Sequence, residues 1–243
     1  MSPSDSEKRA VAVYCASSLG TQKAYQEAAI SLGRALAAAE RPLVYGGGSK
    51  GIMGVVSGAV LQAGGQVTGV VPWAMVAAGG EGEKTGKGEA RDQAVHIILN
   101  ERGREKVDTV IVNSMHERKV EMARRSAAFI ALPGGYGTFE EIAEVTTWTQ
   151  LGIHNKPVIC LNVLSYYDSL RTLVKNGVRE GFIQEKNESL ILFVDGPASP
   201  EEHATFDWGK AALEVLDNWK RDDEATYDWS RTVDDKGDTL EIA

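Results

Sequence analysis

A short glycine-rich segment supplies the residue types needed to bind an anion. Residues 133–141 read Pro-Gly-Gly-Tyr-Gly-Thr-Phe-Glu-Glu, after an apolar run at 127–132 and before a helical pattern. Because Gly134, Gly135 and Gly137 lack a β-carbon, backbone N–H groups at this turn can approach an anion closely. The helix that follows adds unpaired amides and the positive end of its dipole. The sequence therefore predicts a phosphate-binding turn.

Glu141 is the carboxylate of this segment for which we predict a chemical role. One interpretation is structural, since Thr138 and Glu141 match the Thr-x-x-Glu capping box, whose side chains satisfy exposed amides at a helix start. The other is functional, because a glutamate in the first turn of a phosphate-binding helix lies near the sugar attached to that phosphate. Such a carboxylate can accept hydrogen bonds from ribose, or stabilise the positive charge that develops when an N-glycosidic bond breaks. Glu140 and Glu144 are interpreted as solvated or supporting residues.

A basic pair opens the preceding predicted helix. Glu121 and Arg125 have the i,i+4 spacing of an ion pair on a solvated helical face. Arg118 and Lys119 instead fall in the first turn, where a cation opposes the helix dipole and needs an anionic partner. A bound phosphate is one such partner, and the planar fork of arginine can also grip a nucleotide or Glu141.

Alternating strands and helices must position these residues. Apolar runs predict strands at 11–16, 42–45, 66–71, 95–99, 109–112, 127–132, 157–162 and 190–194, and helices at 23–40, 51–64, 115–126, 138–151, 166–180 and 200–219. This order predicts an α/β fold, a doubly wound and mostly parallel sheet flanked by helices.

Three turns stand at the carboxyl ends of predicted strands, where such sheets bind ligands. They are the segments 17–20, 46–49 and 133–138, all rich in glycine or serine. The turn at 46–49, taken alone, has a steric explanation of equal weight, because tight turns between strand and helix need glycine. Three together favour a binding site.

Composition and charge set the class of protein. With 243 residues, 43% hydrophobic and 25% charged, the chain predicts one globular domain at 10–220 and flexible tails at 1–9 and 221–243. Of the net charge of -8, much lies at 222–243, which hold eight acidic residues against two basic ones. Residues 76–91 lack an apolar period and predict a mobile surface loop. The N-terminus has no apolar signal core, and Cys15 and Cys160 fall inside apolar strands, so we expect a soluble, cytoplasmic protein with reduced thiols.

The absence of two common nucleotide-binding motifs restricts the class of ligand that we expect. Neither a Gly-x-Gly-x-x-Gly fingerprint after the first strand nor a Gly-Lys-Ser/Thr phosphate loop occurs, which favours a mononucleotide-sized phosphate over NAD or ATP with magnesium. The four histidines are scattered, so we predict neither a metal nor a cofactor. A nucleic acid or a membrane is not expected as a partner.

Two motifs resemble those of a known family. Met115, His116, Arg118 and Lys119 form Met-His-x-Arg-Lys, and residues 133–141 form Pro-Gly-Gly-x-Gly-Thr-x-x-Glu. This pair resembles the LONELY GUY enzymes, cytokinin riboside 5′-monophosphate phosphoribohydrolases that have often been labelled lysine decarboxylases. The similarity extends over roughly residues 10–217 and includes the segments 45–54 and 150–157.

The resemblance implies a Rossmann-like fold and a reaction. That reaction is hydrolysis of the bond between N9 of an N6-substituted adenine and C1′ of ribose 5′-phosphate, with AMP as an expected further substrate. Arg118 and Glu141 match the family's catalytic pair. The predicted substrate-binding residues are Ser18, Gly47, Met115, Lys119, Gly134, Gly135, Gly137 and Thr138. The family works at least as a dimer, so the resemblance also implies a homo-oligomer whose partner subunit helps to close the pocket.

Two other functions are weighed against this one. A lysine decarboxylase needs a lysine that forms a Schiff base with pyridoxal phosphate, and no lysine here has a recognisable cofactor-binding context. A nucleotide or cofactor carrier of the same fold would bind without reacting. Such a carrier has no use for a carboxylate placed against the sugar, so the position of Glu141 favours the hydrolase.

Overall fold

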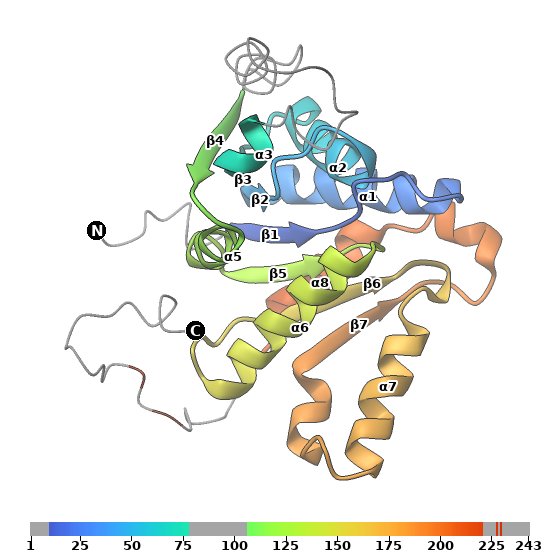
Figure 1. Ribbon diagram of the computed structural model, residues 1–243. Coiled ribbons are helices and arrows are strands. Elements are labelled where there is room, and N and C mark those ends of the chain that lie inside the picture. Colours follow the sequence, from blue (N-terminus) through green and yellow to red (C-terminus); the bar gives the residue numbers. More distant parts are fainter. Residues whose placement is uncertain (1–9, 78–105, 221–226, 228, 230–243) are drawn as a thin grey trace.

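In the described part of the chain, seven parallel strands form a single sheet (Figure 1). The computed structural model describes residues 10–77, 106–220, Tyr227 and Trp229. The strands are β1 (Val11–Tyr14), β2 (Leu43–Tyr45), β3 (Val67–Pro72), β4 (Val107–Val112), β5 (Ala128–Ala131), β6 (Val158–Asn162) and β7 (Ile191–Asp195). They lie in the order β4-β3-β2-β1-β5-β6-β7, and every neighbouring pair is parallel. The predicted α/β class is confirmed.

Helices cover both faces of the sheet. The α-helices are α1 (Lys23–Ala38), α2 (Gly51–Gln62), α3 (Trp73–Ala77), α5 (Met115–Arg124), α6 (Tyr136–Leu151), α7 (Asp168–Arg179) and α8 (Trp208–Asn218). The described residues also form short 3₁₀ helices, which are η2 (Val163–Ser165), η3 (Glu185–Leu190) and η4 (Pro200–Ala204). Helices α1, α2 and α8 pack on one face, and α5 and α6 on the other.

The two hydrophobic cores follow from the alternation of side chains along each strand. In β1, Val11 and Val13 point to the core shared with α1, α2 and α8, whereas Ala12 and Tyr14 point to the core shared with α5 and α6. All four residues are buried, as expected for a parallel strand covered on both faces. A continuous apolar run in the sequence is therefore the correct signal for this strand.

The order of strands reverses at β1. The chain runs outward from β1 through β2 and β3 to β4, then returns to place β5 on the other side of β1. Tyr14 pairs with Ala131, so the two strands end side by side. In a doubly wound sheet the crevice beyond the carboxyl ends of two such strands is the place where ligands bind. The turns after β1 and β5 border this crevice.

Several predicted boundaries are wrong. Helix α6 begins at Tyr136, two residues before the predicted start. The predicted helix at 200–219 is two elements, because η4 ends at Ala204 and Asp207 caps a new helix by accepting from the Lys210 amide at 3.0 Å. Val76 is buried in α3 rather than part of a surface loop.

Other expectations lie outside the described residues. These are residues 78–91 of the predicted loop, the strand at 95–99, the tail at 1–9 and all of the tail at 221–243 except Tyr227 and Trp229. The Trp229 indole donates to the carbonyl oxygen of Leu151 at 2.9 Å, at the end of α6. None of the helices in the described part of the chain is both long and apolar enough to cross a membrane.

Candidate active site

A pocket of about 260 Å³ opens at the point where the strand order reverses. Its walls come from the end of β1 and the loop after it, from the turn after β2, and from the first two turns of α6. The lining residues are Val13, Tyr14, Cys15, Ala16, Ser17, Ser18, Gly46, Met53, Arg118, Gly135, Tyr136, Gly137, Thr138 and Glu141. All three predicted glycine or serine turns thus contribute to one cavity, the turn at 46–49 through Gly46.

The N-terminus of α6 presents its amides to this pocket. Gly135 is the N-cap residue, and the first bond within the helix runs from the Phe139 amide to the Gly135 carbonyl at 3.0 Å. No side chain among the described residues caps this end. In α5, by contrast, Ser114 accepts from the Glu117 amide at 3.0 Å. Uncapped amides at the positive end of a 16-residue helix form a ready site for an anion.

Sterics require glycine at position 134 but not at positions 135 and 137. A β-carbon on Gly134 would lie 2.1 Å from Oγ1 of Thr138, so only glycine lets the turn close onto the helix. A β-carbon on Gly135 or Gly137 would meet no atom within 4 Å. Those two glycines face open space, and this space is available to a ligand.

Arg118 is a buried cation held by backbone oxygens. Its side chain reaches from α5 to the middle of β3 and the end of β2, where Nε donates to the Val70 carbonyl at 3.1 Å and Nη2 to the Gly46 carbonyl at 3.2 Å. A β-carbon on Gly46 would lie 1.9 Å from Nη2, so the arginine needs glycine at this position. The third nitrogen, Nη1, lies 4.0 Å from Oε1 of Glu141. The guanidinium is thereby fixed with one edge toward the carboxylate.

Glu141 is the carboxylate of the pocket. It lies in the second turn of α6 rather than the first, with 12% of its side chain exposed. The capping-box interpretation is therefore wrong, because the helix begins at Tyr136. Burial raises the pKa of Glu141 to about 7, the Arg118 charge opposes this rise, and the charge of Glu140 adds to it. A carboxyl group with a pKa near neutrality is suited to proton transfer at physiological pH.

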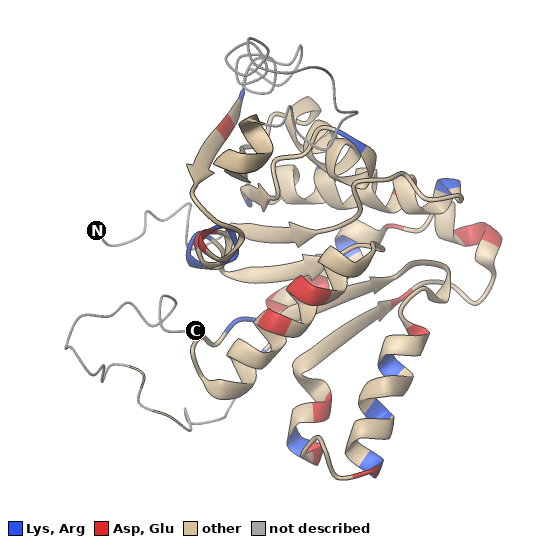
Figure 2. Ribbon diagram, in the orientation of Figure 1, with Lys and Arg blue, Asp and Glu red and all other residues tan. Residues whose placement is uncertain are grey.

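Lys119 points to a different set of carboxylates. Its ammonium group donates to Glu140 at 2.6 Å and to Glu144 at 2.9 Å, both on α6. Figure 2 shows acidic residues along this helix. Burial lowers the pKa of Lys119, but these two hydrogen bonds outweigh it and raise that pKa. Lys119 thus neutralises the acidic residues that flank Glu141, and it does not line the pocket.

The structure brings most predicted site residues together. Ser18, Gly135, Gly137, Thr138, Arg118 and Glu141 all line the pocket, and Gly134 lies in the same turn, packed closely against Thr138. Gly47, Met115 and Lys119 lie outside the lining. A β-carbon on Gly47 would meet the Val71 side chain at 2.2 Å, and Met115 is 48% exposed on α5. For these three the structure gives no contact with the pocket.

Sequence reasoning did not assign several of the lining residues, among them Tyr14, Met53 and Tyr136. Tyr14 stacks on Phe129 with ring centroids 5.8 Å apart. Burial, followed by the charge of Glu141, raises the pKa of Tyr14 well above its usual value, so its phenol stays protonated. The sequence did hold a signal for Tyr14, namely its position at the carboxyl end of the first strand, where ligands bind.

Comparison with known proteins adds sequence relatives. The family described as "possible lysine decarboxylase" matches residues 53–202. A rice protein (Oryza sativa subsp. japonica) named a probable cytokinin riboside 5′-monophosphate phosphoribohydrolase is 47% identical over 192 residues, which are 79% of this chain and 74% of that protein. A cytokinin riboside 5′-monophosphate phosphoribohydrolase of Arabidopsis thaliana is 41% identical over 201 residues, which are 83% of this chain and 84% of that protein.

Solved structures are more distant. A molybdenum cofactor binding protein from the phototrophic bacterium Rippkaea orientalis superposes with a TM-score of 0.51 at 17% identity, covering 86% of this chain and 96% of that one. A structural-genomics target superposes with a TM-score of 0.52 at 16% identity, covering 87% of this chain and 99% of that one. At this identity the likeness shows a common fold.

Proposed function

The chain belongs to the LONELY GUY family of cytokinin riboside 5′-monophosphate phosphoribohydrolases, and we propose on that basis that it hydrolyses the N-glycosidic bond of cytokinin riboside 5′-monophosphates. The products are the free base and ribose 5-phosphate, and AMP is a second substrate that yields adenine. One observation carries the proposal, namely that the uncapped amides of α6 and the Arg118–Glu141 pair line the same pocket.

The geometry of α6 matches the length of a ribose 5-phosphate. The phosphate binds at the amides of residues 135–138, in a pocket that Ser18 also lines. Glu141 lies three residues beyond Thr138, and at about 1.5 Å of rise per residue this places its backbone about 4.5 Å deeper along the helix. A sugar attached to the bound phosphate therefore lies beside the Glu141 carboxylate.

The reaction replaces one bond at C1′ of the ribose. The C1′–N9 bond breaks with its electron pair going to the purine, and a water oxygen forms the new bond to C1′. The Glu141 carboxylate stabilises the positive charge that develops at C1′, and it accepts the proton that the attacking water gives up. The departing purine takes up one proton from solvent, and Glu141 afterwards releases to solvent the proton that it accepted, so atoms and charge balance over the reaction.

Arg118 acts by charge and position. A guanidinium stays protonated in proteins, so it is not the proton donor. Two of its nitrogens are engaged by the Val70 and Gly46 carbonyls, which leaves Nη1 for Glu141 and for the nucleotide. Its charge favours the ionised form of Glu141, the form that can take a proton from water.

Assembly and compartment form part of the same proposal. We place a second subunit over the mouth of the pocket, because the aromatic side chains around it are exposed: Tyr136 is 92% exposed and Phe139 41%. We place the protein in the cytoplasm, because Cys15 and Cys160 are buried thiols rather than halves of a disulfide.

The name lysine decarboxylase finds no support at this site. Among the described residues that line the pocket, none is a lysine. The likeness to a cofactor-binding protein extends to the fold alone, whereas the sequence relatives at 41–47% identity are named as hydrolases.

Base release from nucleotides tests the proposal. Purified protein is incubated with isopentenyladenosine 5′-monophosphate and with AMP, and free base is measured by mass spectrometry. We expect release by the wild type and at least a hundredfold loss in Glu141→Gln with nucleotide binding retained, since such electrostatic groups contribute about 10²–10³ in rate. Glu140→Gln, one residue away and outside the pocket lining, is the matched control and should keep most of the activity. No base from either substrate, or near-normal turnover by Glu141→Gln, would reject the proposal.

A further inference from the structure

Two consecutive tyrosines bond to the backbone of the glycine turn. The Tyr166 hydroxyl donates to the Gly134 carbonyl, and the Tyr167 hydroxyl donates to the Leu132 carbonyl at 2.7 Å. Both carbonyls belong to the segment that joins β5 to α6. Tyr167 is 1% exposed, and Tyr166 packs edge-on against Tyr25 with ring centroids 6.1 Å apart. Neither tyrosine lines the pocket.

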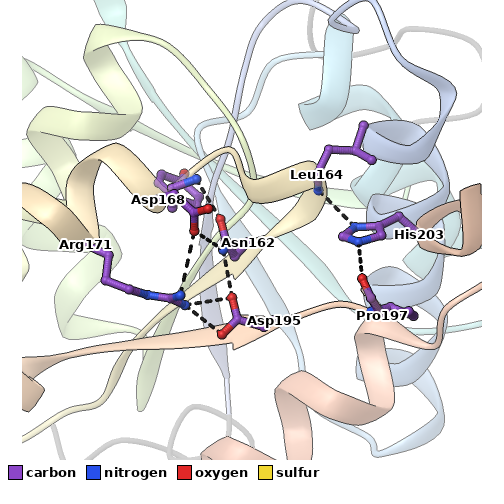
Figure 3. A network of polar contacts seen from close by, with 8 residues as sticks. Asn162, Leu164, Asp168, Arg171, Asp195, Pro197 and His203 are labelled. Atoms are coloured by element: carbon purple, nitrogen blue, oxygen red, sulfur yellow. Dashed lines mark hydrogen bonds and ion pairs between the residues drawn. The ribbon is translucent and has the colours of Figure 1, made fainter. Parts of the chain in front are cut away.

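The tyrosines follow a backbone turn of unusual conformation. In η2, Leu164 has φ 52° and ψ 37°, and Ser165 has φ 58°, both in the left-handed region without being glycine. Such residues persist only where the surrounding structure enforces them, and they occur preferentially at functional sites. The Leu164 amide donates to Nδ1 of His203 at 2.9 Å, and Nε2 of His203 donates to the Pro197 carbonyl at 2.8 Å (Figure 3). The histidine therefore holds one end of the turn.

A polar network at the ends of β6 and β7 holds the other end. Asn162 accepts from the Tyr167 amide at 2.7 Å, and its amide group donates to Asp168 at 2.8 Å and to Asp195 at 2.7 Å (Figure 3). Arg171 donates to both oxygens of Asp195, at 2.7 and 2.8 Å. Asn162 is buried, and these hydrogen bonds satisfy every polar group of its side chain, as burial requires.

The planar peptide links these contacts to the pocket. The C=O of Gly134 and the N–H of Gly135 belong to one trans peptide unit and point in opposite directions. A hydroxyl that fixes the Gly134 oxygen outside the pocket therefore also fixes the direction of the Gly135 N–H, at the N-cap of α6. The Leu132 peptide precedes Pro133 and has no N–H, so Tyr167 anchors the start of the turn rather than an amide.

We propose that Tyr166 and Tyr167 are positioning residues, held by the strained η2 turn. Tyr166 orients the amide of Gly135 toward the substrate's phosphate, and Tyr167 anchors the start of the turn that carries this amide. This inference rests on the proposed function, because it assigns the phosphate to that amide. It differs from a purely structural role in one measurable respect. Loss of a hydroxyl should weaken binding of the phosphorylated sugar itself, beyond any effect on the folding of the protein.

Hydroxyl deletion tests the proposal with a readout independent of catalysis. Tyr166→Phe and Tyr167→Phe each remove one hydrogen bond and keep the ring. Tyr25→Phe is the matched control, since its ring lies in the same aromatic cluster without bonding to the glycine turn. Affinity for ribose 5-phosphate is measured by calorimetry, together with KM and kcat for AMP and the melting temperature.

We expect the dissociation constant for ribose 5-phosphate to rise about five- to tenfold in Tyr166→Phe and in Tyr167→Phe, the ratio that corresponds to one net hydrogen bond. The KM for AMP should rise in parallel, with kcat changed less than about twofold, and Tyr25→Phe should match the wild type.

Unchanged ribose 5-phosphate affinity in both variants would overturn the positioning role, even if their melting temperatures fell. If Tyr167→Phe does not fold, Tyr166→Phe decides alone, because Tyr166 is 37% exposed and tolerates the change. A wild type that binds ribose 5-phosphate but releases no base would instead refute the proposed function.

Discussion

Glu141→Gln should stabilise the protein, and the gain should grow as the pH rises from 4.5 to about 7. The ordinary pKa of the glutamate side chain is 4.5, and burial raises the pKa of Glu141 to about 7 in the folded state. The Glu141 carboxyl binds its proton more tightly in the folded protein than in the unfolded chain. Its favourable contribution to the free energy of unfolding is therefore fully present below pH 4.5. That contribution is lost as the pH rises from 4.5 to about 7, where the buried group must ionise.

The magnitude follows from the difference between the two pKa values. Each pKa unit corresponds to about 1.36 kcal/mol, so the ionised Glu141 lowers the free energy of unfolding by about 3 kcal/mol above pH 7. With 12% of the side chain exposed, screening by solvent takes away little of this cost. Glutamine keeps the shape and never ionises, so the variant should be more stable than the wild type by about 3 kcal/mol at pH 8 and about 1 kcal/mol at pH 5.

Urea unfolding at pH 5, 6, 7 and 8 measures this difference directly. Thermal unfolding should show a melting temperature about 6–12 °C higher for Glu141→Gln at pH 8, at about 2–4 °C per kcal/mol for a domain of this size. Glu214→Gln on α8 is the control, because that carboxylate is exposed and pairs with Lys210 at 3.9 Å. A gain that is the same at pH 5 and pH 8, or a variant less stable than the wild type at pH 8, would refute the assignment of the cost to a buried charge.

Two further predictions concern activity. If the ionised Glu141 is the working form, kcat/KM for AMP should fall about tenfold per pH unit below about pH 7 and level off above it, and a flat profile from pH 5 to 8 would contradict this. Lys119→Met should move the midpoint of that profile to higher pH, because Lys119 lowers the pKa of Glu141 and neutralises Glu140 and Glu144, which raise it. Comparison of the two profiles on the same substrate cancels the titration of the nucleotide phosphate, and a midpoint that stays or moves to lower pH would show that Lys119 does not act on Glu141.

The inner strands were predictable because burial on both faces leaves a continuous apolar run. In β5 the residues Ala128–Ala131 are all buried, and the chain has few ways to place such a run except in the middle of a sheet. The site turn was predictable for a related reason: it follows β5 directly, and the carboxyl end of a central strand is where a doubly wound sheet binds its ligand.

The start of α6 was not predictable from local pattern. Gly135, Tyr136 and Gly137 have low helix propensity, and a Thr-x-x-Glu match stood two residues later. What decides the helix start is tertiary: Thr138 is buried under the turn, and Glu141 faces Arg118 from another helix. Contacts between residues 20 or more positions apart, such as Lys119 with Glu140, leave no trace in a single sequence.

The same long-range contacts set the chemistry of Glu141. An arginine free to move would close on the carboxylate with two short hydrogen bonds and hold its pKa low. Arg118 is not free, since the Val70 and Gly46 carbonyls hold two of its nitrogens and leave Nη1 at 4.0 Å from Oε1. Arg118 therefore neutralises the Glu141 charge only in part, and burial, which raises the pKa of Glu141, is the larger effect. Gly46 therefore affects the pKa of Glu141 indirectly. Because Gly46 has no β-carbon, the Arg118 guanidinium can bond to the Val70 and Gly46 carbonyls, and these bonds keep it from closing on Glu141.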